Sequence, residues 1–335
     1  MAVQFVKSAV MPYGPAPAEE KRALQLIEVC GRTAYKSEDR ITEDSAKAFV
    51  LMLKSHGHLS VLEHSNIVLK IEWEKAEDNA QTAASFNHFL NALKDRLGFH
   101  RIFPLNSGSN SGLIVSGNFR AWLETLDYIR GCEPFLHGIF AESLNRFFPS
   151  IFQTAGDPGP SPFRASLVEE QEQIEIWKKN RDFDLPVFVF RFVCDRGITH
   201  EVVRHRVFSF TQESTRYVNY KNKGMVLMLP EELHDAYDDA KCDFRVDSAL
   251  VREWKKRAEL IFDWYREDLS RGLRPEIARD ILPNLLKSEI FVSGRWSGWK
   301  HFVRLRESNQ AHPRIRFIAK EVRKYFEGLG ISCNN

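Results

Sequence analysis

The chain has 335 residues, of which 43% are hydrophobic and 27% are charged, as is ordinary for a globular protein. With 47 Lys and Arg against 45 Asp and Glu, the net charge of +2 excludes a protein that binds nucleic acid through a generally basic surface. The sequence has no apolar run long enough to cross a membrane, and its five cysteines are widely spaced. Such cysteines suit reduced thiols, so we expect a cytoplasmic protein.

Hydrophobic spacing predicts the elements of the first third of the chain. Apolar residues recur at helical spacing over 18–37 and 43–56, and they alternate with polar residues over 67–73, as in a half-buried strand. Residues 79–98 are predicted to form a further helix. The Ser- and Gly-rich stretch 106–112 is predicted to be a loop.

The rest of the chain is predicted to be mainly helical. A helix is expected to begin at Phe119 with Asn118 as its N-cap, because an Asn side chain can accept a hydrogen bond from the first helical turn. Apolar residues at helical spacing predict further helices over 135–148, 246–271 and most of 275–329.

Two stretches are predicted to be strands, the apolar run 187–194 and residues 224–229. The Pro- and Gly-rich residues 156–162 are predicted to interrupt regular structure before them. A short helix is expected to begin after Gly197.

His200 and His205 resemble part of a zinc-binding HExxH motif, but their spacing differs. HExxH requires its second histidine four residues after the first, so that both share one face of a helix. Here Arg204 takes that position, and His205 points about 140° away from His200 on a regular helix. We therefore expect no metal site.

Residues 191–220 are unusually rich in groups that bind anions. They contain five arginines and two histidines but no lysine, with hydroxyl and amide side chains between them. Guanidinium groups bind phosphate and planar carbonyl groups through two parallel hydrogen bonds, which lysine cannot do. The segment therefore predicts a site for a phosphorylated ligand with a polar ring. The alternative is an Arg-rich interface helix followed by a strand.

The same segment resembles a known family. Arg204-His205-Arg206, seven further residues and Ser214 fit RHRx7S, the signature of flavin-dependent thymidylate synthases, and the string SFTQESTRYVNY is also similar to that family. Other stretches with family-like patterns are HGHLSVLEH at 56–64, PEIARDILP at 275–283, HFVRLR at 301–306 and AHPRIR at 311–316. The resemblance covers about 18–73 and 186–329.

The resemblance implies a single α+β domain over 1–335, with a central antiparallel or mixed sheet flanked by helices. Residues 74–185 would be a mostly helical insertion relative to the shortest members. It also implies FAD as cofactor, and methylation of dUMP to dTMP with methylenetetrahydrofolate as carbon donor and NADPH as reductant, releasing tetrahydrofolate. The protein would be a homotetramer with shared active sites, and no membrane or nucleic-acid partner is expected.

By resemblance, seven residues are expected to bind dUMP: Glu201, Arg204, Gln212, Ser214, Arg216, Arg279 and Arg306. Arg306 is expected beside the pyrimidine ring, where a cation stabilises negative charge on the uracil carbonyls. Ser214 is expected to hydrogen-bond the ligand rather than act as a nucleophile, because no His–Asp pair stands at a recognisable spacing. Structural ion pairs are the alternative for Glu201, Arg279 and Arg306.

The residues that by resemblance face FAD are His58, Ser60, Glu63, Arg204, His205, Arg206, Val207 and His301. Together with dUMP-binding Arg306 and Ser214, His58 is expected to be catalytic. For His58 the alternative is a residue that merely ends a helix, and for His205 it is a packed helix residue.

The sequence departs from the family at one flavin-binding motif. Where the family carries Asn-x-Arg, this chain has Arg295 and Ser297, so either Arg295 sends its guanidinium to the same place or flavin binding is altered. Asn118 and Arg120 form another Asn-x-Arg in a similar context. We hypothesise that they supply the two side chains near the flavin; coincidence with helix capping is the alternative.

Two other functions stay open. One is a paralogue that alkylates C5 of another uridine nucleotide, which the altered motif and the insertion favour. The other is a non-catalytic nucleotide- or RNA-binding protein, which would hold no flavin and would bind with a steep salt dependence. The nearly neutral net charge argues against this second alternative.

Overall fold

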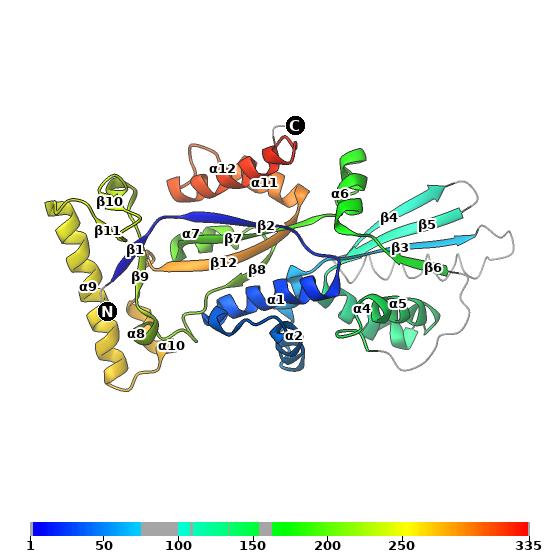
Figure 1. Ribbon diagram of the computed structural model, residues 1–335, viewed down its shortest axis with the longest axis horizontal. Helices are drawn as coiled ribbons and strands as arrows, with labels where there is room; N and C mark the ends of the chain where they lie inside the picture. The colour runs from blue at the N-terminus through cyan, green and yellow to red at the C-terminus, as the bar shows by residue number, and fades with distance from the viewer. Residues whose placement is uncertain (1–2, 75–99, 108–109, 133, 154–162, 334–335) are drawn as a thin grey trace. The chain divides into compact units, whose positions relative to one another are not determined.

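The computed structural model describes residues 3–74, 100–107, 110–132, 134–153 and 163–333 (Figure 1). The chain divides into two compact units. Unit 1 contains Met1–Tyr13, Gly31–Asp39 and Val189–Asn335, and unit 2 contains Gly14–Cys30 and Arg40–Phe188. No helix in the described ranges has the length and apolar character of a membrane span.

A four-stranded sheet contains the two central strands of unit 1. Its order is β2 (Ala9–Pro15), β7 (Val187–Asp195), β12 (Lys287–Arg295) and β8 (Ser209–Gln212), and β12 runs antiparallel to β8. The strand predicted over 187–194 is confirmed as β7. The prediction of mainly helix over 275–329 is wrong at β12. This strand is buried on both faces, so it lacks the alternation that identifies a half-buried strand.

Helices follow both central strands directly. Helix α7 (Arg196–Val202) follows β7, and α11 (Trp296–Arg306) follows β12, as Figure 1 shows. Helix α12 (Pro313–Gly328) packs with α11 against β7, where the Phe190 ring lies 4.7 Å from that of Trp299 and 5.9 Å from that of Phe326. The chain's many phenylalanines thus serve to bury these helices on the sheet.

Unit 1 contains further short elements and the long helix α9, most of which pack on a second hydrophobic cluster. These are β1 (Gln4–Val6), the 3-10 helix η1 (Glu38–Arg40), α8 (Tyr220–Lys223), β9 (Val226–Met228), η3 (Glu231–Leu233), β10 (Tyr237–Asp238), β11 (Asp243–Phe244), α9 (Ala249–Ser270), α10 (Pro275–Ala278) and η4 (Arg279–Ile281). The cluster joins β1, which pairs parallel with β9, to the inner face of α9. The predicted strand over 224–229 and helix over 246–271 are confirmed.

Unit 2 contains a separate antiparallel sheet. Its order is β4 (Arg101–Ser107), β5 (Asn110–Gly117), β3 (Ile67–Glu74) and β6 (Phe163–Leu167). Its helical elements are α2 (Ser45–Ser55), η2 (Leu59–His64), α4 (Phe119–Cys132), α5 (Pro134–Phe147) and α6 (Glu170–Lys179), while α1 (Glu20–Tyr35) contributes residues to both units. The predicted helices over 18–37, 43–56 and 135–148, the helix from Phe119 and the strand over 67–73 are confirmed.

The predicted loop at 106–112 is wrong. Asn106 pairs with Ser111 and Leu105 with Gly112 in the β4–β5 hairpin, so polar residues near its end continue the two strands. Backbone pairing satisfies their N–H and C=O groups despite the turn-like composition. Strands therefore accompany the predicted helices in the segment 74–185. The predictions for 79–98 and 156–162 lie outside the described residues.

Two glycines of unit 1 make room for one aromatic ring. A Cβ atom on Gly294 would lie 2.1 Å from Cδ1 of Phe208, and one on Gly298 would lie 2.7 Å from Cε1 of the same ring. Phe208 packs against Trp299 with 4.3 Å between ring centroids. Residues 204–207, which we call the signature turn, directly precede Phe208. By making room for the Phe208 ring, the two glycines therefore fix the position of this turn.

We expect Gly294→Ala to destabilise unit 1. The added methyl group would displace the buried Phe208 ring, and overpacking of this kind costs about 1–3 kcal/mol of unfolding free energy. Urea denaturation followed by tryptophan fluorescence measures the effect. Gly328→Ala is the matched control, because a Cβ there meets nothing within 4 Å. Equal midpoints for the two variants would contradict the role assigned to the glycine.

Candidate functional site

A basic cavity of about 690 Å³ lies in unit 1, between the signature turn and the end of α11. Its lining residues are Arg204, His205, Arg206, Val207, His301, Arg304, Leu305, Arg306, Ser308, Gln310 and Ala311. Four are arginines and two are histidines, and none of these described lining residues is acidic. A concave site of this composition suits an anionic ligand.

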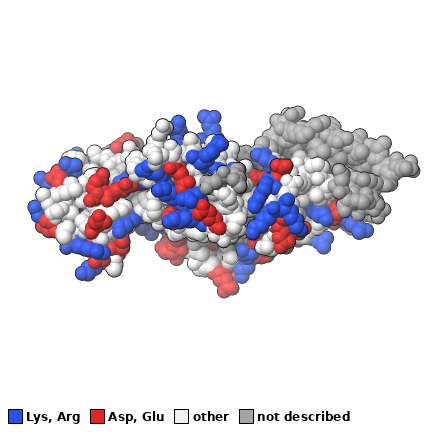
Figure 2. Space-filling model, turned by 90° about the horizontal axis from the view of Figure 1, so that it is seen from above, with Lys and Arg blue, Asp and Glu red and all other residues white. Residues whose placement is uncertain are grey.

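The positive character is local to the cavity. The face drawn in Figure 2 carries patches of Lys and Arg beside patches of Asp and Glu, and neither sign covers that face alone. This mixture agrees with the net charge of +2. An anion would therefore be attracted by the arginines that line the cavity rather than by the overall charge of the chain.

His205 lies in the turn after α7 and is 7% exposed. Its Nε2 accepts a hydrogen bond of 2.9 Å from Nε of Arg306. Burial, followed by the nearby positive charges of Arg306, His301 and Arg204, lowers the pKa of His205 to about 4. The ring is thus neutral at neutral pH. Since Nε2 accepts, the proton is assigned to Nδ1. His205 is not a packed helix residue, because α7 ends before it.

Arg306 connects His205 to helix α7. Besides the bond to His205, its guanidinium donates to Oε2 of Glu201 at 2.8 Å and to the Glu201 backbone carbonyl at 3.0 Å. The Arg306 side chain is 13% exposed, so these three bonds hold it in one orientation. The ion pair considered as an alternative for Glu201 and Arg306 is present.

Residues 211–216 alternate between the interior and the surface. Thr211, Glu213 and Thr215 are buried, whereas Gln212 and Ser214 are half-buried and Arg216 is exposed. Over 211–213 the alternation follows from the extended backbone at the end of β8, and residues 215–217 then form a turn in which the Val218 N–H donates to the Ser214 carbonyl. Gln212, Ser214 and Arg216, all predicted to bind dUMP, are thus less buried than the residues between them.

Neighbouring elements hold this segment in place. The amide of Gln212 donates to Oγ1 of Thr199 on α7 at 2.9 Å and to Oγ of Ser288 on β12 at 3.0 Å. The Arg279 guanidinium donates to Oγ1 of Thr215 at 3.2 Å. The structure thus brings Arg279 beside the segment that carries Gln212, Ser214 and Arg216.

Five of the predicted flavin residues belong to unit 2, namely His58, Ser60, Glu63, Asn118 and Arg120. His58 and Ser60 are exposed at the start of η2, and Glu63 pairs with Arg120 at 2.8 Å. Arg120 also donates to Glu124 at 2.7 Å, while Asn118 Oδ1 accepts from the Ala121 N–H and caps α4. The structure therefore brings Arg120 to a predicted flavin residue and gives Asn118 its expected capping role. Flavin binding by this group stays a prediction.

The cavity gathers the other predicted flavin residues, Arg204, His205, Arg206, Val207 and His301, around the predicted dUMP residue Arg306. Nδ1 of His301 lies 3.4 Å from the Arg304 guanidinium. Arg295 is instead the N-cap residue of α11 and is not among the cavity residues, and Ser297 lies in the first turn of that helix.

The sequence analysis missed several cavity residues, namely Arg304, Leu305, Ser308, Gln310 and Ala311. They end α11 or lie in the loop before α12. Arg304, Leu305 and Ala311 lie within the family-like stretches 301–306 and 311–316, and Ser308 and Gln310 lie between them, which was the signal that could have found them. In the described parts of the chain, no three His, Cys, Asp or Glu side chains gather as a metal site would require.

Comparisons with known proteins agree with this site. Residues 176–329 match the family described as "Thymidylate synthase complementing protein". Over 128 residues the chain is 36% identical to the flavin-dependent thymidylate synthase of Pyrococcus abyssi, covering 38% of this chain and 48% of that protein. A protein of the same name from Mycobacterium sp. (strain KMS) is 36% identical over 132 residues, covering 37% and 51%. The chain thus spans about half the length of these curated relatives.

A solved structure is also similar in part, a UMP/dUMP methylase PolB from Streptomyces cacaoi bound with 5-Br dUMP. The match has a TM-score of 0.36 and 23% sequence identity, and it covers 48% of this chain and 76% of that one.

The family match includes β7, the signature turn, β12 and both C-terminal helices, which are the elements that build the basic cavity. The mixed α+β class expected from the resemblance is also the class observed. The resemblance seen in the sequence is therefore confirmed: residues 176–329 match the family described as thymidylate synthase complementing protein, and the curated relatives named above are flavin-dependent thymidylate synthases.

Proposed function

We propose that the protein is a flavin-dependent thymidylate synthase, which methylates dUMP to dTMP with methylenetetrahydrofolate as carbon donor and NADPH as reductant. The observation that carries the proposal is the basic cavity built by the family-matched residues, with four arginines, two histidines and no acidic lining residue in the described chain. The names of the relatives support the same activity. As the resemblance implies, we also propose a homotetramer with shared active sites.

The cavity residues fit FAD. Arg204 and Arg206 supply guanidinium forks that suit a pyrophosphate group, and His205 supplies a neutral ring with a proton on Nδ1. When bound, FAD would supply the hydride and one-carbon transfer chemistry. The protein would then bind the flavin and the substrate and orient them toward one another.

The segment 212–216 and Arg279 fit a nucleotide monophosphate. Arg216 and Arg279 offer cations for the phosphate, while Ser214 offers its hydroxyl and Gln212 its amide oxygen to a polar ring, because the Gln212 amide nitrogen already donates to Thr199 and Ser288. Arg306 is held in place before any ligand arrives, because Glu201 and His205 fix its guanidinium. A preoriented cation of this kind stabilises negative charge on uracil carbonyls at little reorganisation cost.

The proposal is tested first by the visible spectrum of the purified protein, before and after FAD is added. Protein-bound flavin absorption is the expected result. Absence of bound flavin in both samples would overturn the proposal and favour a binding protein. A paralogue acting on another uridine nucleotide is the second candidate, because Arg295 and Ser297 replace the family's Asn-x-Arg. Mass spectrometry of products formed from dUMP and from UMP separates the two enzymes.

We expect Arg306→Lys to lower kcat/KM for dUMP by about 10- to 100-fold. A lysine cannot donate to His205 Nε2, the Glu201 carboxylate and the Glu201 carbonyl at once, and each charge-assisted bond contributes about 1.5–3 kcal/mol. Steady-state kinetics with saturating folate and NADPH measure the change.

Arg252→Lys is the matched control for this substitution. Arg252 is an exposed arginine of α9 whose guanidinium bonds the side chain and carbonyl of Asp247. An exposed pair of this kind contributes little, so its kinetics should stay within about twofold of the parent protein. Equal effects of the two substitutions would contradict the role given to Arg306.

His205 should stay neutral in the folded protein until the pH falls to about 4, with its proton on Nδ1. Nitrogen NMR of ¹⁵N-histidine-labelled protein measures this, and the same protein in concentrated urea should titrate near about 6.5. Because the folded pKa is the lower one, this group makes folding less favourable as the pH falls from about 6.5 to about 4. Arg306→Gln should raise the pKa while leaving it below 6.5, since burial is the larger cause. Titration of the parent protein near 6.5 would refute the assignment.

A further inference from the structure

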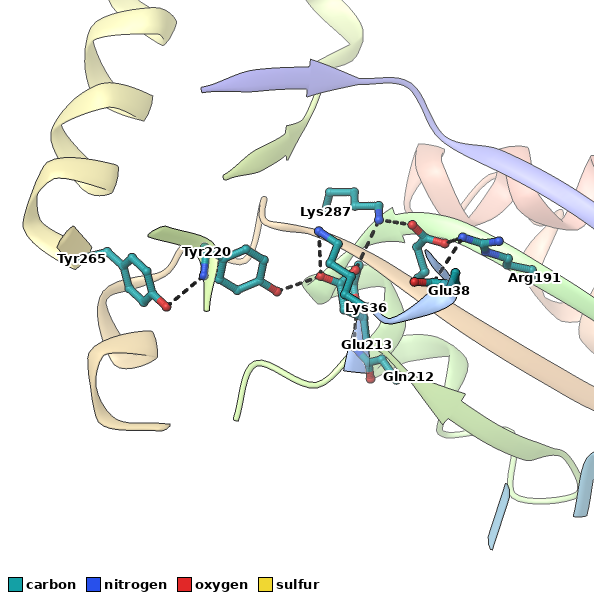
Figure 3. Close-up of polar contacts among 10 residues, drawn as sticks. Lys36, Glu38, Arg191, Gln212, Glu213, Tyr220, Tyr265 and Lys287 are labelled. Carbon is teal, nitrogen blue, oxygen red and sulfur yellow. Dashed lines mark hydrogen bonds and ion pairs between the residues drawn. The ribbon is translucent and has the colours of Figure 1, made fainter. Parts of the chain in front are cut away.

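A network of six buried or half-buried charges lies within unit 1, beside the segment 212–216 (Figure 3). Its cations are Lys36, Arg191 and Lys287, and its carboxylates are Glu38, Glu213 and Glu289. We call these six residues the charge network. They come from the stretch between the end of α1 and the start of η1, from β7, from the end of β8 and from β12, so four segments distant in sequence meet here.

Glu213 is the most buried carboxylate of the charge network, with 1% of its side chain exposed. It lies 3.3 Å from the ammonium of Lys36 and 3.3 Å from that of Lys287, and it accepts a 2.9 Å hydrogen bond from the Tyr220 hydroxyl. Burial and the Glu213 charge raise the pKa of Tyr220, which keeps that hydroxyl a donor. Every oxygen of Glu213 is therefore neutralised or hydrogen-bonded.

Lys287 also contacts a second carboxylate of the charge network, Glu289, which continues the network to Arg191 and Glu38. Glu289 contacts both Lys287 and Arg191, and Arg191 also lies 4.0 Å from Glu38. Positive and negative groups are equal in number. A buried ion pair is costly to break from one side, because the remaining charge is left without a partner.

Lys36 occupies a backbone position that normally favours glycine. Its φ is 51°, and the N–H groups of Lys36 and Ser37 donate to the carbonyls of Thr33 and Arg32, the pattern that ends a helix in a Schellman motif. A side chain is disfavoured in this left-handed conformation. The ammonium of Lys36 pairs with Glu213 and lies 5.3 Å from the centre of the Tyr220 ring. These contacts offset the cost of placing a side chain in the left-handed conformation.

Glu213 stands between two residues proposed to bind the nucleotide, Gln212 and Ser214. Its backbone N–H donates to the Glu289 carbonyl at 2.8 Å, and the Ser214 N–H donates to the Ala34 carbonyl at 2.9 Å. In extended chain a shift by one residue exchanges the two faces. Such a shift would carry Glu213 out of its ion pairs and turn Gln212 and Ser214 inward.

We propose that Glu213 is the positioning residue of the nucleotide-binding segment, and that Lys36 and Lys287 anchor it. The ion pairs set which side chains of 212–214 face outward and hold this part of the segment in that register, directly before the turn at 215–217. The nucleotide part of this inference rests on the proposed function. The positioning part does not, since it concerns the chain without ligand.

The first test is amide hydrogen exchange of Glu213→Gln, measured by mass spectrometry on peptides from 209–220 without ligand. Gln keeps the shape of the side chain but leaves two ammonium groups facing a neutral amide. Exchange in this segment should become about tenfold faster or more, because local opening needs less free energy. The exchange rates of unit 2 peptides should stay as in the parent protein.

The second test is dUMP binding and kinetics on the FAD-loaded variant. The dissociation constant and KM for dUMP should rise about tenfold, while kcat stays within about threefold, because looser positioning weakens binding before it affects the reacting groups. Glu38→Gln is the matched control. It makes the same change in a carboxylate that is 33% exposed and 4.0 Å from its partner, and it should change neither exchange nor binding.

Lys36→Gly supplies a second variant that does not depend on the stability of Glu213→Gln. Glycine relieves the left-handed position, so the helix end is retained while the ammonium is lost. Faster exchange over 209–220 is expected here too. Unchanged exchange in both variants overturns the proposal, as does faster exchange with unchanged dUMP affinity and KM. If the parent protein fails to bind dUMP, the proposed function is wrong. The positioning role of Glu213 is then still supported if exchange over 209–220 is faster in Glu213→Gln but not in Glu38→Gln.

Discussion

The site in unit 1 depends on the requirement that a buried charge meet an opposite charge or a full set of hydrogen bonds. Arg306 satisfies it with Glu201 and His205, and Glu213 satisfies it with Lys36 and Lys287. The cavity differs, because Arg204, Arg206 and Arg304 on its lining are exposed to solvent and no described lining residue is acidic. The ion pairs thus fix the side chains of Arg306 and Glu213, and the unbalanced positive charge of the cavity lining suits an anionic ligand.

Much of this could be read from the sequence. Apolar spacing identified α1, α2, α9 and β7, and the arginines of 191–220 indicated an anion site whose residues 204–207 do line a cavity. Strand β12 was missed because burial on both faces removes the alternation that marks a strand. The hairpin of β4 and β5 was missed because long-range pairing overrides the local preference of Ser and Gly for turns.

Other residues could not be found from local patterns. Glu213 sits inside the signature segment, yet its partners Lys36 and Lys287 lie far away in sequence, and each lysine alone reads as an ordinary surface charge. The pairing of Glu63 with Arg120 is similar, since only the fold of unit 2 brings η2 to the start of α4. Ion pairs between distant segments follow from topology, and spacing along the chain carries no information about them.

The order of the strands also constrains how the chain folds. The central strand β12 comes late in the sequence, and the sheet places it between β7 and β8. Its residues Glu289 and Lys287 are partners of Arg191 and Glu213, which precede it in the sequence. Contacts of such wide sequence separation form slowly, because a long loop must close before any of them is made. During synthesis the arginine-rich segment therefore leaves the ribosome well before the strand that completes it. Until β12 has emerged, Arg191 lacks Glu289 and Glu213 lacks Lys287, so water takes the place of these partners, and the nascent protein must stay soluble in that unfinished state.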